Sequence, residues 1–449
     1  MTSAPSSSPK PVLAALSRHL PGLAAQGAPE ALAPFRIGGR LPQALVVPAT
    51  AEQVGETLAL AQREGWGVVP WGAGRDMAAG REPTRYHVAL SLAGLTRVIE
   101  HDAENLTLTA QAGLPLAEAN RQVRGARQFV PLGHAEDART LGGLVAVNRP
   151  VARRLLYGDV RDQLLGLRVA MPDGRLVRFG RKVVKNVAGY DMGKLFTGCA
   201  GMLGAIVEVT LKLCALPDQA ALAAARFGSA EEAAAAAAEL YRSQLAPAQI
   251  VLLDGAGARA CLDPRAEDGA GLCWVAASFE GRAVGVRRQT ADALAAMARH
   301  GGGEGRVLPP WTPQASAWMD APAPQGEGAL RLRLGSAPAS LARWAAALSQ
   351  WAGAVGMRAA LVADYGGGWL RGSLRPGLRQ PDPEALAAAL HEMRASLERE
   401  RGYLALESAP AAVMQKIGPW GSLGGETAVL NVLRRQLDPK EVLAPGRFL

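Results

Sequence analysis

The chain has 449 residues, which predicts two or three domains and a sizeable buried core. An apolar fraction of 49% with a mean hydropathy of +0.05 excludes a disordered or membrane-embedded protein. The formal charge is +9, only seven of the 49 basic residues are Lys, and basic residues neither cluster nor alternate with aromatic ones. We therefore expect no nucleic-acid binding, whereas an anionic substrate, cofactor or partner suits the charge.

The cysteines argue against bound metal centres, and the N-terminal segment argues against a secreted or membrane-spanning protein. No CxxC pair occurs among Cys199, Cys214, Cys261 and Cys273, so we expect neither a zinc site nor an iron–sulfur cluster. Residues 1–30 begin rich in Ser and Pro, and their apolar run is too short for a signal peptide or a membrane span. The expected location is cytoplasmic, without a transmembrane segment, and at the inner membrane only through partners.

In chain order, the first half predicts a β-α-β unit followed by more strands. Residues 44–47 form a buried strand, Thr50 to Gln53 match a capping box that begins a helix ending at Gly65, and residues 66–70 form the next strand. Asp173-Gly174 predicts a hairpin turn. The remaining expected elements are a helix at 116–123 and strands at 106–111, 164–171, 175–179 and 206–213.

After Pro217, helices and strands alternate. We expect helices at 231–245, 286–299, 338–353 and 383–400, and strands at 248–253, 272–279, 329–334, 359–364 and 369–374. This alternation predicts an antiparallel sheet with helices on one side. The stretch 301–328, which contains three consecutive glycines and Pro309-Pro310, is predicted to be a mobile loop.

Four glycine-centred segments in the first half suggest a binding site. The first, residues 70–76 (PWGAGRD), follows a strand, and its glycines allow backbone N–H groups to approach phosphate oxygens. A surface turn explains this segment alone equally well. It lacks the third glycine of GxGxxG, at Met77, which disfavours a nicotinamide enzyme of Rossmann type. The other three segments are 140–148, 181–191 and 198–204.

The order and spacing of these segments resemble the FAD-linked oxidases whose flavin domain is of the para-cresol methylhydroxylase and vanillyl-alcohol oxidase type. The resemblance covers roughly residues 46–216 and the C-terminal tail. It rests on residues 70–76, 141–146, 157–166, 185–191, 201–212 and 437–448. Within the family, the strings KNVAGYD (185–191) and PGRF (445–448) are most similar to the FAD-binding E subunit of glycolate oxidases.

The resemblance implies an α+β architecture in four parts. We expect an N-terminal extension at 1–40, a two-part FAD-binding domain at 41–217, and an α+β cap or substrate-type domain at 218–425 with an antiparallel sheet and helices on one side. The last segment, 426–449, is expected to return to the FAD domain.

The resemblance also implies which residues contact FAD. The diphosphate is expected at Pro70, Trp71, Gly72, Ala73, Gly74, Arg75 and Asp76, and the ribityl and diphosphate path at Leu141, Gly142, Gly143 and Asn148. Gly201, Gly204 and Ile206 are expected at the adenine half or the isoalloxazine edge, with Arg447 near the ring. Lys185 and Asn186 are candidates beside the ring, where a lysine would stabilise the anionic reduced flavin; a solvated turn is the alternative for Lys185.

Departures from the family pattern affect the expected mode of FAD attachment and the expected substrate site. Relatives that attach flavin covalently use His or Cys, whereas the loop here has Arg75-Asp76, which favours non-covalent FAD. His134 is either a neighbour of the ring or a partly exposed loop residue, and the latter is favoured. No two of the six histidines lie close in sequence, so we expect no substrate-binding metal. No catalytic residue is assigned.

The function implied is that of an FAD-dependent oxidoreductase subunit. It belongs to a complex that oxidises glycolate or a similar 2-hydroxy acid to the 2-oxo acid and passes electrons onward. The expected partners are a second FAD subunit and an iron–sulfur subunit, and the substrate is bound here or elsewhere in the complex. Two alternatives stay open: a self-sufficient FAD-dependent oxidase or dehydrogenase of another small alcohol or hydroxy acid, and a non-catalytic scaffold subunit that retains the flavin fold.

Overall fold

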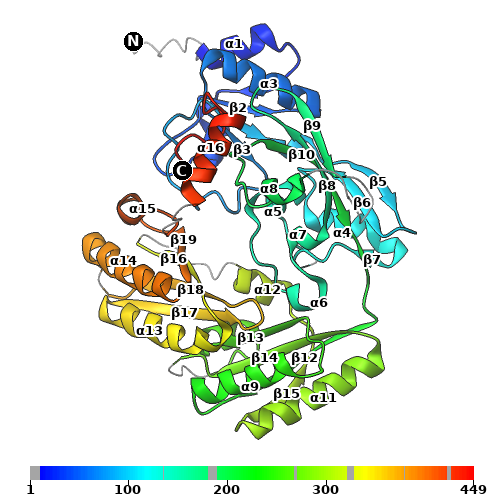
Figure 1. Cartoon of the computed structure of the whole chain (residues 1–449), viewed down its shortest axis with the longest axis vertical. Coiled ribbons are helices and arrows are strands. Elements are labelled where there is room, and N and C mark those ends of the chain that lie inside the picture. The colour runs from blue at the N-terminus through cyan, green and yellow to red at the C-terminus, as the bar shows by residue number, and fades with distance from the viewer. Residues whose placement is uncertain are drawn as a thin grey trace, which may run out of the picture.

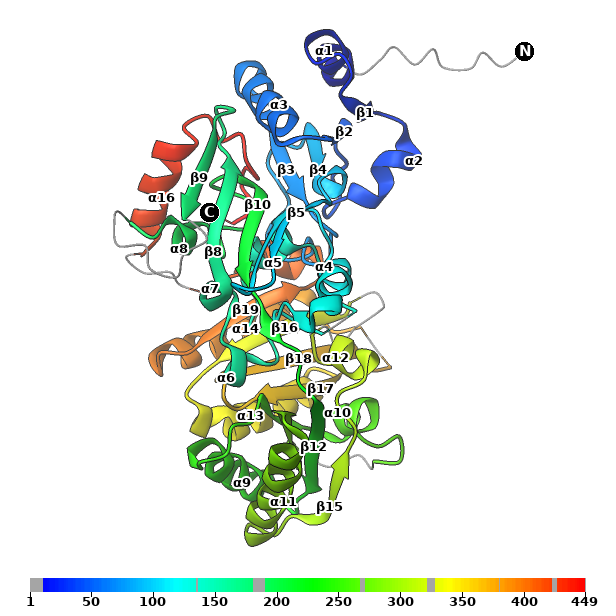
Figure 2. The ribbon, with the colours of Figure 1, turned by 90° about the vertical axis from the view of Figure 1, so that its right-hand side faces the viewer.

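The structure, a computed structural model, describes residues 11–134, 136–180, 190–266, 271–320, 328–378, 380–421 and 426–448. Figures 1 and 2 show an elongated molecule with two halves. The upper half contains the N-terminal part of the chain together with the C-terminal helix α16 (Glu426–Leu437), and the lower half contains the segment between them. The α+β fold class predicted from the sequence is confirmed.

The first sheet of the upper half has the strand order β1-β2-β4-β3. Its strands are β1 (Ala24–Gln26), β2 (Ala44–Val47), β3 (Val68–Trp71) and β4 (Val88–Ser91), with β4 parallel to both β2 and β3. Helix α3 (Ala51–Glu64) connects β2 to β3 and buries Val54 and Leu58. As predicted, the Thr50 side chain caps it by accepting from the Gln53 amide, and Gly65 ends it at φ +70°.

The second sheet is antiparallel, with the order β5-β6-β10-β8-β9. Its strands are β5 (Val98–Asp102), β6 (Thr107–Gln111), β8 (Leu164–Ala170), β9 (Leu176–Gly180) and β10 (Ala205–Lys212). The predicted turn at Asp173-Gly174 joins β8 to β9, with Gly174 at φ +91°. Shorter elements surround the two sheets of the upper half: α1 (Pro11–His19), α2 (Pro29–Leu32), α4 (Leu116–Val123), β7 (Gln128–Phe129), α5 (Leu141–Val147), α6 (Arg154–Tyr157), α7 (Val160–Gln163), α8 (Met192–Phe196) and β11 (Cys214–Ala215).

The C-terminal segment packs on the first sheet. After α16, Leu443 forms a parallel bridge with Val68 of β3, and the Val68 amide donates to the Val442 carbonyl at 2.7 Å. Val442 and Leu443 are both fully buried there. The end of the chain therefore lies beside the strand that leads into the first glycine-rich loop.

The lower half is one antiparallel sheet of eight strands, in the order β15-β12-β14-β13-β17-β18-β16-β19. Helices α9 (Ala230–Arg242), α11 (Ala283–Arg299), α13 (Leu341–Ala354) and α14 (Pro383–Arg399) cover one face, as Figure 1 shows. The strands are β12 (Gln219–Arg226), β13 (Gln249–Leu253), β14 (Trp274–Gly281), β15 (Gly303–Leu308), β16 (Leu330–Gly335), β17 (Met357–Asp364), β18 (Trp369–Pro376) and β19 (Tyr403–Ser408). The smaller helices are α10 (Gly255–Cys261), α12 (Pro313–Asp320) and α15 (Ala411–Ile417).

Several regions differ from the sequence-based expectation, among them β4, β5 and β19, which were not predicted. The predicted loop 301–328 contains strand β15 and helix α12, so that prediction is wrong for residues 303–308 and 313–320. Strand β12 was not predicted because its sequence, QAALAAAR, has no β-branched residue. Its eight-residue pairing with β14 overrides the helical preference of alanine.

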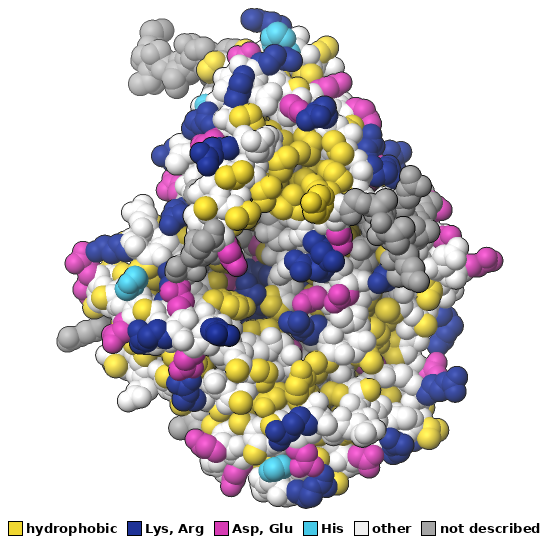
Figure 3. Space-filling view, in the orientation of Figure 1, with side chains coloured by type: hydrophobic (Ala, Val, Ile, Leu, Met, Phe, Trp, Pro, Cys, Tyr) yellow, Lys and Arg dark blue, Asp and Glu magenta, His cyan; other side chains and the backbone are white. Residues whose placement is uncertain are grey.

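Among the described residues, no helix combines the length and the apolar character that crossing a membrane requires. On the face shown in Figure 3, Lys and Arg side chains are scattered among acidic ones and form no continuous basic stripe.

Candidate functional site

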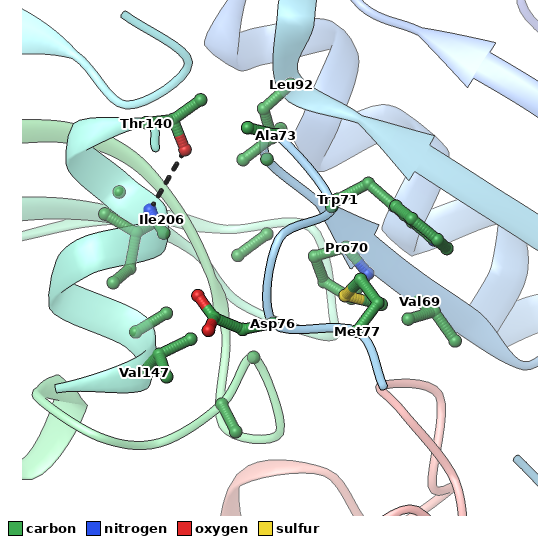
Figure 4. Close-up of a pocket in the computed structure, with 18 of the residues that line it drawn as sticks. Val69, Pro70, Trp71, Ala73, Asp76, Met77, Leu92, Thr140, Val147 and Ile206 are labelled. Atoms are coloured by element: carbon green, nitrogen blue, oxygen red, sulfur yellow. Dashed lines mark hydrogen bonds between the residues drawn. The ribbon is translucent and has the colours of Figure 1, made fainter. Parts of the chain in front are cut away.

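A groove in the upper half brings together segments that are far apart in sequence. The loop after β3, helix α5, the turn before β10 and the C-terminal segment form its walls. Of the predicted cofactor residues, those that line it are Pro70, Trp71, Gly72, Ala73, Gly74, Arg75, Asp76, Gly142, Gly143, Gly201, Gly204, Ile206 and Arg447. Figure 4 shows this groove, with Ala73 and Asp76 on the loop and Thr140 and Val147 on the facing helix.

The loop after β3 presents main-chain donors to the groove. The amides of Ala73, Gly74, Arg75 and Asp76 donate to no atom of the described residues. Gly74 has φ +72°, a left-handed conformation that glycine adopts without strain. Consecutive N–H groups without acceptors form an anion-binding concavity. The loop therefore fits a diphosphate.

Helix α5 closely approaches this loop. The Thr140 hydroxyl accepts from the Gly143 amide at 3.2 Å and caps the helix, as the dashed line in Figure 4 shows. A Cβ on Gly72 would lie 2.3 Å from the Thr140 Oγ1, and one on Gly142 would lie 2.6 Å from the Ala112 Cβ. Glycines at these positions let the helix pack against the loop and β6. The Leu141 to Gly143 turn expected from the sequence is thus the first turn of a helix.

The turn before β10 forms another wall. Gly201 has φ +75°, and a Cβ there would touch the Pro70 ring at 3.4 Å. A Cβ on Gly204 would collide with Val169 at 2.4 Å. Both glycines therefore allow the turn to pack tightly against neighbouring segments, and Ile206 follows at the start of β10.

Arg447 reaches the groove from the C-terminal segment and is only 1% exposed. Its guanidinium donates to the carbonyls of Met77 at 2.9 Å, Ala79 at 2.6 Å and Arg81 at 3.3 Å. Burial lowers its pKa to about 10. Arg447 thus fixes the chain that follows the glycine-rich loop.

Some predicted residues are placed differently. Leu141 is buried in the core and Asn148 ends α5 in a left-handed conformation, and neither lines the groove. The Trp71 side chain packs on Phe35 and donates to the Tyr86 hydroxyl at 2.9 Å, and in Figure 4 it points away from α5. Lys185 and Asn186 lie outside the described residues.

Beyond the groove lies a cavity of about 520 Å³ between the two halves. Arg75, Asp76 and Arg139 line both spaces. The remaining walls of the cavity are His134, Glu136, Asp137, Ala138, Arg149, Pro313, Gln314, Ala317 and Arg331. His134 is a half-buried loop residue, which is the placement that the sequence favoured.

A buried ionic cluster joins the halves beside this cavity. Arg149 pairs with Asp76 of the loop and with Glu407 of β19, the second at 3.2 Å. Arg333 and Arg371 each approach Glu407 at 3.4 Å. Burial alone raises the pKa of Glu407, but the surrounding guanidinium groups outweigh burial and lower this pKa to about 2. The cluster fixes the loop relative to the lower sheet.

Sequence reasoning missed several residues of the site. Thr140 carried a readable signal, because a threonine before a helical run is a typical N-cap. Arg139, Arg149 and Arg331 carried none, because their partners and the cavity come from other parts of the chain. In the described part of the chain, no three His, Cys, Asp or Glu side chains group as they would around a metal ion.

Two family models match separate parts of the chain. Residues 42–180 match the model of an FAD binding domain, and residues 216–318 match that of the FAD linked oxidases, C-terminal domain. The glycolate oxidase subunit GlcD of Bacillus subtilis is 30% identical over 48% of this chain and 46% of its own length. For the GlcD of Escherichia coli K12 the identity is 30%, over 56% and 52% of the two chains.

The D-2-hydroxyglutarate dehydrogenase of Xanthomonas citri pv. viticola is 32% identical over 38% of this chain and 37% of its own. The chain thus matches about half or less of the length of these relatives. Among solved structures, p-cresol methylhydroxylase has a TM-score of 0.73 at 17% identity, covering 94% of this chain and 93% of its own. A 4-ethylphenol oxidase from Gulosibacter chungangensis has a TM-score of 0.74 at 14% identity, covering 97% and 96%. Residues 42–180 and 216–318 therefore contain an FAD binding domain and the C-terminal domain of FAD linked oxidases, and the chain has the fold of p-cresol methylhydroxylase.

Proposed function

We propose that this chain binds FAD non-covalently in the groove and works as an FAD-dependent oxidoreductase subunit. Its complex oxidises glycolate or a similar 2-hydroxy acid to the 2-oxo acid and passes electrons onward. FAD supplies hydride and electron transfer, while the protein positions it and sets its electrostatic surroundings. The relatives named as glycolate oxidase subunits and a 2-hydroxy acid dehydrogenase support this substrate class.

The observation that carries the proposal is the row of unbonded amides from Ala73 to Asp76 at the groove. These N–H groups offer the diphosphate hydrogen bonds without any rearrangement of the loop. Gly142 and Gly143, in the first turn of α5, line the opposite wall. Arg447 holds the following segment in place through three carbonyls.

The test is to place a negative charge among these amides. Ala73 is exposed in the loop, so Ala73→Asp should fold normally but repel the diphosphate. We expect full-length wild-type protein to purify with FAD that denaturation releases intact, and the variant to bind FAD at least about tenfold more weakly. Ala73→Ser, the matched control, should retain FAD. Equal FAD affinity in all three proteins would contradict the proposed diphosphate position.

The proposal extends to the partners, a second FAD subunit and an iron–sulfur subunit. The relatives named as subunits of a glycolate oxidase support an assembly of several chains. We propose a cytoplasmic location, with any contact to the inner membrane made through partners. This arrangement is tested by purifying the tagged chain from its own cell. The chains that accompany it are then identified, and their iron content is measured.

One observation favours a second candidate, in which the chain oxidises substrate alone. Four arginines, Arg75, Arg139, Arg149 and Arg331, line the cavity next to the groove. Burial lowers the pKa of Arg331, and its Nε has no hydrogen-bond partner among the described residues, so a carboxylate there would offset the cost of its burial. Anaerobic addition of glycolate or D-lactate to the isolated chain decides: bleaching of the flavin supports this candidate, and its absence supports the subunit.

A further inference from the structure

Residues 29–41, nearly all of which the sequence places in an N-terminal extension, pack on the sheet that carries the glycine-rich loop. This segment contains α2 and the turn that follows it. Phe35, at the end of that turn, packs against a buried cluster that contains Trp71 and Tyr86. Met77, just after the glycine-rich loop, packs against the same cluster. The extension therefore lies next to the loop that we propose binds the diphosphate.

Two buried hydrogen bonds connect the extension to the last residue of β3. The Trp71 indole nitrogen donates to the Tyr86 hydroxyl at 2.9 Å, and this hydroxyl donates to the Phe35 carbonyl at 2.8 Å. Trp71 and Tyr86 are each 5% exposed. The Phe35 ring also meets the Trp71 ring edge to face, with 5.0 Å between the ring centroids. The tyrosine hydroxyl thus acts as both acceptor and donor, and it fixes the orientation of the indole.

The Trp71 ring in turn supports the glycine-rich loop. A Cβ on Gly74 would lie 3.0 Å from Cζ3 and 3.3 Å from Cε3 of the indole, so the Gly74 backbone rests against the six-membered ring. In Figure 4 the Trp71 side chain points away from α5, and the loop lies between the two. The ring therefore restricts movement of the loop away from the helix that faces it.

The order of this loop affects how tightly a diphosphate binds. Consecutive amides have to point at the phosphate oxygens together, and any freedom that the loop has in the free protein is lost on binding. The pair of Asp76 with Arg149 holds the far end of the loop. Trp71 holds its near end, and Tyr86 acts on the loop only through Trp71.

We propose that Tyr86 is a positioning residue of the FAD site. Through the Trp71 indole it holds the glycine-rich loop in the arrangement that receives the diphosphate, and its bond to Phe35 makes the segment 29–41 part of that site. This inference rests on the proposed function, because the loop is the proposed position of the FAD diphosphate.

Titration of FAD into full-length apoprotein tests the role of Tyr86. Tyr86→Phe keeps the ring and removes both hydrogen bonds, and it should weaken FAD binding about fivefold. Trp71→Phe removes the indole N–H through which Tyr86 acts. In the Trp71→Phe background, Tyr86→Phe should therefore cause no further loss of affinity. Wild-type affinity in Tyr86→Phe, or a full further loss in the double variant, overturns the proposal.

Tyr157→Phe is the matched control. The Tyr157 hydroxyl donates to Glu280 at 2.8 Å, and Tyr157 lies outside the walls of the groove. This variant also loses a hydrogen bond of a tyrosine hydroxyl, so its unfolding free energy should fall while its FAD affinity stays at the wild-type value. A loss of affinity equal to that of Tyr86→Phe would mean that general destabilisation weakens FAD binding, and it would overturn the specific role of Tyr86.

Tryptic cleavage after Arg75, whose side chain is exposed in the loop, reports on the order of the loop without FAD. In apoprotein, Tyr86→Phe should be cut there about fivefold faster than wild type, and saturating FAD should slow the cut in both. Cleavage at the wild-type rate overturns the role of Tyr86 even where wild type binds FAD. Wild-type protein that takes up no FAD contradicts the proposed function, and this inference with it.

Discussion

The side chains of Arg149 and Glu407 meet at 3.2 Å although 258 residues separate them in the chain. Arg149 also pairs with Asp76 in the loop that we propose holds the FAD diphosphate. Glu407 belongs to β19, and its side chain is 5% exposed. One buried network thus connects the proposed cofactor loop to the lower sheet.

Glu407→Gln should strongly destabilise the protein. The substitution removes the negative charge that balances Arg149, Arg333 and Arg371 in a buried site. Breaking a buried ion pair on one side typically costs about 3–5 kcal/mol in the free energy of unfolding. Urea denaturation at neutral pH measures this loss. Glu384→Gln is the control, because the pair of Glu384 with Lys416 is exposed and should contribute less than about 1 kcal/mol.

The same network predicts a pH dependence. The pKa of Glu407 is about 2 in the folded protein and 4.5 is its ordinary value, so the carboxylate contributes stability above the ordinary pKa. This contribution should fall as the pH drops from 4.5 toward 2. The difference in unfolding free energy between wild type and Glu407→Gln should shrink over this window, and a constant difference would contradict the assigned charge.

The sequence predicted those features that depend on neighbouring residues. Thr50 caps the backbone three residues ahead through its side chain, Gly65 and the Asp173-Gly174 turn act through their own backbone, and the structure has each as predicted. The glycine loop at 70–76 lines the groove, and its proposed function could be inferred from the sequence because it rests on main-chain groups. Features that depend on distant residues could not be predicted from the sequence. No local pattern marks Arg149 as the partner of Glu407. Strand β12 is stabilised by its pairing with other strands and not by the intrinsic preference of its alanines.

Gly142→Ala should weaken FAD binding. A Cβ at this position would lie 2.6 Å from the Ala112 Cβ and 3.0 Å from its carbonyl oxygen, so α5 must shift relative to β6 and to the loop after β3. We expect a loss of about tenfold in FAD affinity, or about 1.4 kcal/mol. Titration of FAD into apoprotein, followed by protein fluorescence, gives the value. Gly353→Ala on α13 meets no atom within 4 Å and should leave the affinity unchanged.

Arg447→Gln should loosen the segment after the glycine-rich loop. Glutamine cannot supply three carbonyls with donors, so the acceptors of Met77, Ala79 and Arg81 lose partners in a buried setting. The expected cost is roughly 2–4 kcal/mol in unfolding free energy, with faster proteolysis near residues 77–81. Limited digestion with mass spectrometry locates the cuts. Arg435→Gln, an exposed change on α16, should leave both stability and digestion as in wild type.

Asp364→Asn should stabilise the protein at alkaline pH. The carboxyl group is fully buried, and burial raises its pKa from 3.8 to about 7. Its oxygens accept from the Gly367 amide at 2.6 Å and from the Gln249 amide group at 3.4 Å. A carboxyl whose pKa is raised by folding contributes stability that falls as the pH rises from about 4 through 7, because the unfolded chain releases the proton first.

The pH profile of the variant separates this charge effect from other changes at the site. Asparagine has no charge to bury. The Gln249 Oε1 has no partner among the described residues, and after the Gln249 side chain turns, this oxygen can accept from the side-chain amide of the asparagine at position 364. At pH 8 the variant should be more stable than wild type by roughly 2–4 kcal/mol, whereas at pH 4 the two should differ little. Urea denaturation at both pH values measures the contrast. A difference that does not depend on pH would mean that Asp364 is already ionised throughout, and that Gln249 and Gly367 stabilise the buried carboxylate.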